Sequence, residues 1–288
     1  MTAVASPGTA PTSPRVQVRP AAFGRVVAAE WVKFRTLRST WWTLGVGVAL
    51  MVGLAVLQTW STSTLADPAE MGIPDFVGAS FITGGVFLAQ LAFCVLGVLA
   101  VTGEYSTGMI RSTFAAVPRR LPVLLAKLLV VFAAVFVVSL VAVALSWAAS
   151  MPWFDELGLT VDLSRSEDLR LVVGAPLYLA TAAALAYAIG ALVRHSAAGI
   201  AIVLGLLLVV ETALAAIPWR PTRMISPFLP SSAGSAVLTE DAMLEGARRS
   251  AEALDVAALG PWQGYGVMAA WVVALLVLAS VLMRRRDA

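Results

Sequence analysis

Residues 123–149 read VLLAKLLVVFAAVFVVSLVAVALSWAA, an apolar run in which Lys127 is the one charged residue. The hydrocarbon core of a bilayer is about 30 Å thick, and about 20 apolar residues cross it as a helix. Because no water reaches that depth, a spanning segment must satisfy its own backbone hydrogen bonds, which a helix does. This run therefore predicts a transmembrane helix.

Five further runs of similar length and character lie along the chain. They cover about residues 41–60, 81–101, 171–193, 197–217 and 266–283. The 288 residues are 59% hydrophobic and 13% charged, with a mean hydropathy of +0.87, a balance far from that of a water-soluble domain. The sequence predicts an all-α polytopic membrane protein with six transmembrane helices.

Basic residues are divided unevenly between the two sides that these spans define. Fourteen of the 20 Lys and Arg lie in residues 1–40, 111–127, 194 and 284–286, whereas thirteen of the 17 Asp and Glu lie in the alternate segments. Lys and Arg near helix ends favour the cytoplasmic side. Both termini are expected in the cytoplasm, with the chain in the plasma membrane, and the scattered charge offers no patch for nucleic acid.

The first 40 residues precede the first span. Residues 1–20 are rich in Pro, Ser, Thr and Ala, which indicates a disordered cytoplasmic tail and no signal peptide. Residues 21–40 predict an amphipathic helix in the cytoplasmic interface, with Arg35 on its polar face. The alternative is an extension of the first span. Glu30 falls on the apolar face, and it is expected to pair with Lys33 one turn along.

Two loops have informative sequences. Residues 103–122 read GEYSTGMIRSTFAAVPRRLP and predict a short helix at about 105–117, which Pro118 ends. Arg119 and Arg120 are expected at the lipid headgroups, with Lys127 extending towards them. Outside the cell, residues 218–264 mix prolines with apolar residues and predict a segment that turns back into the membrane, followed by an amphipathic helix at 241–259.

Small residues recur at every fourth position in the first, fourth and fifth spans, a spacing that permits close helix contact. The contact can lie within one chain or at a subunit interface. The three series are Gly45, Ala49 and Gly53, then Ala182, Ala186 and Gly190, then Ala197, Ala201 and Gly205. The fourth and fifth spans are separated by so few residues that they must form a tight hairpin.

Common catalytic sites lack their residues in this sequence. A P-loop needs a lysine directly after glycine, whereas Lys33 follows Val32 and Lys127 follows Ala126. A single histidine excludes paired-histidine zinc motifs, and no G-x-S-x-G elbow occurs. We expect no enzymatic activity and no metal or cofactor bound by this chain.

Glu211 is the one carboxylate well inside a predicted span. Since desolvating a carboxylate in a bilayer is costly, such a residue is a candidate for the substrate or proton pathway. Its position near the outer end of the span also fits a purely structural role, because a carboxylate there can reach the interface or take up a proton.

Three segments together resemble the ABC-2 type permease subunits of bacterial ABC transporters. They are AEWVKFRTLRSTWW before the first span, GEYSTGMIRSTFAAVPRR after the second and FLPSSAG after the fifth, and the likeness covers most of residues 22–286. The resemblance implies a type V exporter-like permease domain at residues 41–286. It also implies a second permease subunit, identical or different, and a separate nucleotide-binding subunit that holds ATP and Mg²⁺.

The resemblance also suggests roles for particular residues. Residues 105–117 would be the coupling helix that touches the ATPase, and residues 227–238 would shape the exit of the pathway. The residues implied around the ATPase contact are Glu104, Tyr105, Arg111, Arg119 and Arg120, with Glu30, Lys33 and Arg35 on the connecting helix at residues 21–40.

An apolar pathway suits hydrophobic or amphipathic cargo, and export follows from the resemblance alone. Two other functions remain open. A secondary carrier or channel would need no ATPase and would depend on Glu211. A non-transporting membrane anchor or sensor would recruit a cytoplasmic partner through the same loop.

Overall fold

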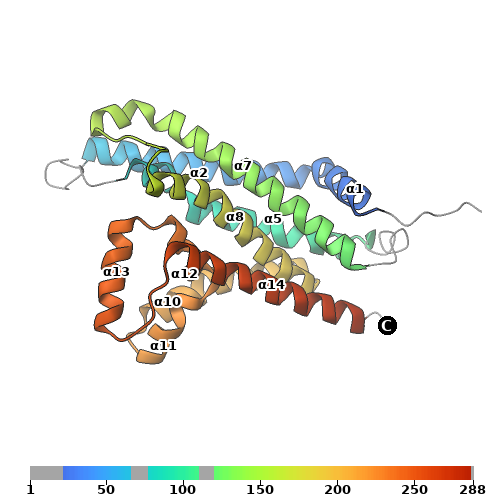
Figure 1. The fold of residues 1–288 in the computed structure, drawn as a ribbon. Coiled ribbons are helices and arrows are strands. Elements are labelled where there is room, and N and C mark those ends of the chain that lie inside the picture. Colours follow the sequence, from blue (N-terminus) through green and yellow to red (C-terminus); the bar gives the residue numbers. More distant parts are fainter. Residues whose placement is uncertain (1–21, 66–76, 110–119, 287–288) are drawn as a thin grey trace, which may run out of the picture.

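The fold is a bundle of long helices that lie side by side, with α13 (Asp241–Ala253) standing across one end (Figure 1). The computed structural model describes residues 22–65, 77–109 and 120–286. Within these ranges the chain forms helices and turns and no strand.

All six predicted spans are confirmed as helices long and apolar enough to cross a membrane. Most run several residues beyond the predicted bounds, because polar and aromatic residues continue the helix past the apolar run. They are α2 (Arg38–Leu65), α4 with α5 (Gly78–Ile82 and Val86–Ser106), α7 (Arg120–Leu157), α8 (Ser166–Val193), α9 with η2 and α10 (Ser196–Leu204, Gly205–Val210 and Glu211–Ala216) and α14 (Pro261–Arg286).

The amphipathic helix predicted before the first span is α1 (Phe23–Thr36). It buries Val26, Glu30 and Phe34 against the bundle and leaves Arg35 exposed, which is the face division that the sequence predicts. Leu37 has extended backbone, with φ −79° and ψ 120°. This break separates α1 from α2, so α1 is a helix in its own right and not a straight extension of the first span.

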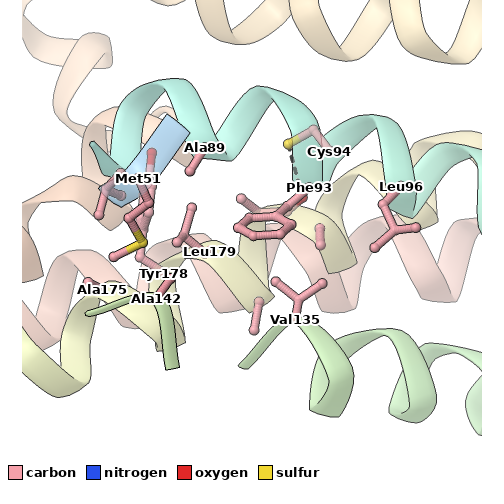
Figure 2. Close-up of a cluster of buried hydrophobic side chains, with 14 of the residues drawn as sticks. Met51, Ala89, Phe93, Cys94, Leu96, Val135, Ala142, Ala175, Tyr178 and Leu179 are labelled. Carbon is pink, nitrogen blue, oxygen red and sulfur yellow. Dashed lines mark hydrogen bonds between the residues drawn. The ribbon is translucent and has the colours of Figure 1, made fainter. Parts of the chain in front are cut away.

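α8 lies at the centre of the bundle and contacts α5, α7 and α14. Its Tyr178, Leu179 and Tyr187 have no exposed surface. Figure 2 shows part of the surrounding core, in which Leu179 of α8 belongs to one cluster with Phe93 of α5 and Val135 of α7. The alanine-rich sequence of α8 permits this position, because small side chains let neighbouring helices approach from several sides.

α5 and α8 approach most closely at small residues. A Cβ atom added to Gly97 would lie 2.2 Å from the carbonyl oxygen of Ala183. The small series of α8, at Ala182, Ala186 and Gly190, is buried, so in this span the series serves packing within the chain. The corresponding glycines of the first and fifth spans, Gly45 and Gly53 of α2 and Gly205 at the start of η2, face open space.

α8 and α9 form the expected tight hairpin. Arg194 ends α8 with left-handed backbone (φ 58°), and Ser196 already begins α9. The Nδ1 atom of His195 accepts a hydrogen bond from the Ala198 N–H at 3.2 Å. This histidine therefore caps a helix.

After the fifth span the chain turns back against the bundle in a series of short helical turns, here called the return segment (residues 220–238). It comprises α11 (Arg220–Ile225), η3 (Ser226–Phe228), α12 (Pro230–Gly234) and η4 (Ser235–Leu238). Its main neighbours include α8 and α14, and Val237 is fully buried. Arg170 of α8 holds the end of this segment by donating to the carbonyl oxygens of Val237 at 2.9 Å and Thr239 at 2.8 Å.

The helix predicted at residues 241–259 is shorter in the structure, where it is α13 and ends at Ala253. Asp255 follows with left-handed backbone (φ 52°), which no helix continues through. At the start of α13, the Asp241 N–H donates to Glu167 Oε1 of α8 at 2.7 Å.

The close approach of α5 and α8 predicts a position-specific effect of adding one methyl group. Gly97→Ala places a Cβ against the Ala183 carbonyl, so the helices must separate, and overpacking of this kind costs about 1–3 kcal/mol. Thermal unfolding of the purified protein in detergent measures the loss. Gly53→Ala is the matched control, because nothing lies within 4 Å of its Cβ position. Equal stability of the two variants would contradict the packing described.

Candidate functional site

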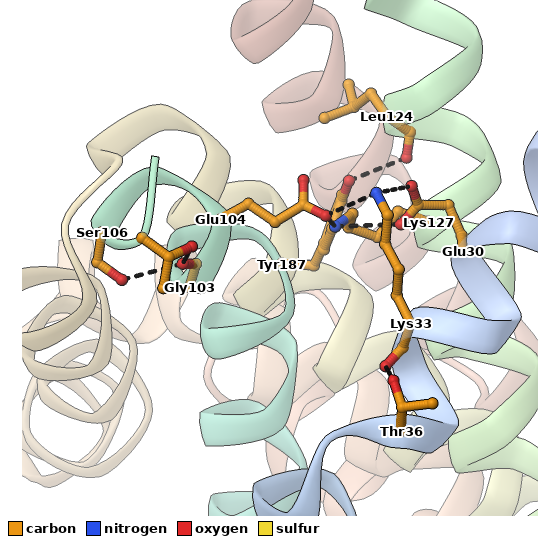
Figure 3. Close-up of polar contacts among 10 residues, drawn as sticks. Glu30, Lys33, Thr36, Gly103, Glu104, Ser106, Leu124, Lys127 and Tyr187 are labelled. Carbon is orange, nitrogen blue, oxygen red and sulfur yellow. Dashed lines mark hydrogen bonds and ion pairs between the residues drawn. The ribbon is translucent and has the colours of Figure 1, made fainter. Parts of the chain in front are cut away.

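Four charged side chains meet at the end of the bundle that carries α1, and we call Glu30, Lys33, Glu104 and Lys127 the charge cluster (Figure 3). Lys33 Nζ lies 2.7 Å from Glu30 Oε1 and 2.9 Å from Glu104 Oε1. Lys127 Nζ lies 3.1 Å from Glu30 Oε2 and 2.6 Å from Glu104 Oε1. Each lysine therefore bridges both carboxylates, in a closed ring of alternating charge.

Three helices that are distant in sequence supply this cluster. Glu30 and Lys33 stand one turn apart on α1, Glu104 lies in the last turn of α5, and Lys127 lies near the start of α7. Apolar contacts beside the ring hold α1 against α7, because Val26 of α1 packs against Val123 and Ala126 of α7. The cluster thus attaches α1 to the two helices on either side of residues 107–119.

Three of the four side chains are almost closed to solvent, whereas the Lys33 side chain is 28% exposed. Glu30 is 3% exposed, Glu104 7% and Lys127 8%. Two carboxylates and two ammonium groups cancel in charge, and this balance is what makes burial tolerable. Burial of Lys33 disfavours its charged form, but the hydrogen bonds to Glu30 and Glu104 outweigh that burial and raise the pKa of Lys33 above its ordinary value.

Two tyrosines extend the polar region around the cluster. The buried Tyr187 hydroxyl of α8 donates to the Leu124 carbonyl oxygen of α7 at 2.9 Å. The guanidinium carbon of Arg194 lies 5.2 Å from the ring centre of Tyr105, which is cation–π distance. The hairpin between α8 and α9 therefore contacts the end of α5 beside the charge cluster.

The structure brings together three of the residues singled out in the sequence. The pairing of Glu30 with Lys33 is confirmed, and Glu104 also pairs with Lys33. Glu104 and Tyr105 belong to the last turn of α5, which continues to Ser106, and not to the start of a separate helix. Arg35 is exposed on the opposite face of α1.

The remaining coupling candidates cannot be placed in the same way. Arg111, Arg119 and most of the predicted coupling helix at 105–117 lie outside the described residues. Arg120 begins α7, and its side chain is likewise outside the described part. Their roles stay predictions.

The prediction that Lys127 extends towards the lipid headgroups is wrong. Its side chain is 10% exposed and turns to Glu30 and Glu104. The physical reason is that two buried carboxylates on neighbouring helices stabilise the ammonium group where it is. A signal for this contact existed in the sequence. Glu30 and Lys127 are isolated charges at apolar positions, and Glu104 follows the second span at the same predicted side of the membrane.

Glu211 lies at the start of α10, far from the charge cluster, and is 4% exposed. Its carboxylate accepts hydrogen bonds from the return segment: Oε1 from the Ser231 N–H at 2.9 Å, and Oε2 from the Ser232 N–H at 2.6 Å. The sequence did not predict these donors, because they lie twenty and twenty-one residues further along the chain.

The charged side chains of the charge cluster attach helices to one another by electrostatic attraction. In the ranges that the structure describes, no group of three or more His, Cys, Asp or Glu is arranged to hold a metal ion. The charge cluster instead joins α1, α5 and α7 so that a force applied to one of them is passed to the others.

One family model matches the chain. The family is described as "ABC-2 family transporter protein", and the match covers residues 26–216. That range contains the whole charge cluster and the first five spans. No curated protein matches the chain.

The ring of charges predicts that removing one lysine destabilises the protein more than removing a matched pair. Lys127→Met leaves an uncompensated buried carboxylate, a loss of about 3–5 kcal/mol. Lys127→Met combined with Glu104→Gln keeps one Glu and one Lys, so the double variant should be more stable than Lys127→Met alone. Thermal unfolding in detergent compares them, with Arg35→Gln on the exposed face of α1 expected within about 0.5 kcal/mol of wild type. A double variant less stable than the single would contradict the ring.

The raised pKa of Lys33 predicts the pH at which the cluster weakens. A group whose pKa is raised by folding stabilises the folded state below its ordinary value, here 10.5, and that stabilisation is lost as the pH rises through the folded-state pKa. The difference in stability between wild type and Lys33→Met should therefore stay constant from neutral pH to about pH 10 and shrink above it. A difference that vanished near neutral pH would contradict this assignment.

Proposed function

The chain belongs to the ABC-2 transporter family, and from that membership we propose that it is the permease subunit of an ATP-driven exporter. Its six spans form the translocation pathway together with a second permease subunit, which is either a second copy or a related chain. A separate nucleotide-binding subunit holds ATP and Mg²⁺ and performs the hydrolysis. Both termini face the cytoplasm, as the distribution of Lys and Arg favours.

The observation that carries this proposal is the charge cluster. It ties α1 to the end of α5 and the start of α7, the two helices on either side of the loop that resembles a coupling element. A partner that pushes on this loop or on α1 moves all three helices together. Since α5 packs closely on the central α8, the displacement passes into the bundle.

The residues divide into two roles in this proposal. Glu30, Glu104 and Lys127 are buried and Lys33 is 28% exposed, so the proposed role of the cluster is to hold the helices together and not to touch the ATPase. Arg35 on α1, with Tyr105 and the loop at residues 107–119, belongs to the side that the ATPase contacts. Glu104 thus acts in coupling through α1 and not by direct contact.

The mechanism needs two states of the pathway. ATP brings two nucleotide-binding subunits together, and the work available is limited by their different affinities for ATP in the open and closed arrangements. Movement of α1 with α5 and α7 then switches the pathway from inward to outward opening. An apolar pathway fits hydrophobic or amphipathic cargo.

The first test is whether the chain has an ATPase partner whose activity it controls. Purification of the tagged chain from its native membranes should bring down a P-loop ATPase, and reconstitution of both should stimulate ATP hydrolysis. Lys127→Met should reduce that stimulation about tenfold, the effect of about 1.4 kcal/mol of lost coupling. Basal hydrolysis and membrane insertion should be unchanged.

Arg249→Gln is the matched control, because it removes a charge from an exposed pair with Glu245 on α13. It should leave stimulation unchanged. Movement of a fluorescent amphipathic dye by vesicles that contain only this chain and no nucleotide would contradict the proposal and favour a secondary carrier. Binding of an ATPase with no stimulation would favour the non-transporting anchor.

A further inference from the structure

Glu211 makes three hydrogen bonds, all to two adjacent serines of the return segment. Besides the two N–H donors, the Ser232 hydroxyl donates to Oε2 at 2.7 Å. Every partner is a donor to a carboxylate oxygen, and both oxygens accept. The carboxylate and the return segment are therefore complementary.

The N–H groups of Ser231 and Ser232 and the Ser232 hydroxyl stabilise Glu211 in place of a positively charged side chain. No ion pair neutralises Glu211 within the described ranges, although the side chain is 4% exposed. Hydrogen bonds to an ionised acceptor are shorter and stronger than neutral ones. A buried carboxylate that lost them would bear a large desolvation cost. Ser231 and Ser232 are consequently held to Glu211 as long as it is buried and ionised.

A π-helix in the fifth span precedes Glu211 and affects the direction in which its carboxylate points. The six residues before Glu211 form the π-helix η2, whose wider turns displace later residues around the axis relative to an unbroken α-helix. Leu208, Val209 and Val210 are exposed, whereas Glu211 is buried against the return segment. The main neighbours of α10 are η2, α11 and η3, so this half of the span leans on the return segment (Figure 1).

A second set of contacts joins the same serines to the centre of the bundle. The Tyr178 hydroxyl of α8 lies 2.6 Å from Ser231 Oγ and donates to Gln90 Oε1 of α5 at 2.9 Å. Ser231 therefore contacts Glu211 with its backbone and Tyr178 with its side chain. Through one residue the return segment links the fifth span to α5 and α8.

We propose that Glu211 is a positioning residue of the exit: its carboxylate ties α10 to the return segment and holds that segment closed over α5 and α8. This inference rests on the proposed function. The return segment opens only when Ser231 and Ser232 separate from the Glu211 carboxylate. As long as these hydrogen bonds are intact, α10 and the return segment move together. Glu211 thus acts through the return segment and carries neither substrate nor protons.

The test measures how often the return segment opens. In a Cys94→Ala background, Val237→Cys places a thiol at a fully buried position of the return segment, where the smaller side chain fits. Glu211→Gln removes the charge and turns one acceptor into a donor that faces N–H groups. Labelling of this thiol by a membrane-impermeant maleimide should become about tenfold faster or more, as expected for lost charge-assisted hydrogen bonds.

Two serine variants separate the carboxylate contact from general disturbance. Ser232→Ala removes a hydroxyl that donates to Glu211 and should speed labelling several-fold, on the order of one lost hydrogen bond. Ser235→Ala removes a hydroxyl that donates to the Ser232 carbonyl oxygen and should leave the rate unchanged. Ser250→Cys, at an exposed position of α13, should react equally in all variants, which controls for differences in the amount of protein and in the maleimide reaction itself. Equal labelling of the Val237→Cys thiol with and without Glu211→Gln would overturn the proposal.

Nucleotide dependence distinguishes positioning from simple packing. In the complex with the ATPase, labelling of Val237→Cys should be slow without nucleotide and fast with a trapped ATP analogue. With Glu211→Gln it should be fast in both states. If the labelling rate of Val237→Cys does not depend on nucleotide but is still increased by Glu211→Gln, the role of Glu211 in holding the return segment is supported. The proposed function is then contradicted. If Glu211→Gln responds to nucleotide as wild type does, the tie is overturned.

Discussion

A charge inside a bilayer must find its partner within the protein, and this constraint organises both ends of the bundle. Neither water nor lipid tails compensate a buried carboxylate or ammonium group. At one end, two lysines and two glutamates neutralise one another. At the other, backbone N–H groups surround Glu211. In each place some of the partners lie on a different helix, so satisfying the charge also fixes tertiary structure.

Between these two sites the bundle is held by close packing of small residues. The contact of Gly97 with Ala183 brings α5 against α8, and α8 is the most buried of the spans. The fifth and sixth spans bury the smallest share of their residues inside the chain, 22% each. The centre is thus suited to remain rigid, whereas α9, α10 and α14 are attached at the periphery.

This arrangement suits a transporter driven by a separate motor. Polar contacts, which can exchange partners, lie between α1 and the bundle and between α10 and the return segment, the two places that move in the proposed function. Apolar contacts between small residues, which resist separation, stand in the centre. In the proposed function, movement at the charge cluster reaches the return segment through α5, which carries Glu104 near one end and Gln90 near the other.

The sequence by itself determined the six spans, the helix α1 and the Glu30–Lys33 pair, because apolar runs and helical spacing depend only on residues close together in the chain. It also carried the family likeness. Only the tertiary structure decided that Lys127 turns to Glu30 and Glu104, and that Glu211 accepts from Ser231 and Ser232. These contacts join helices far apart in the chain, and which faces meet depends on packing against every neighbour at once, which no local pattern records.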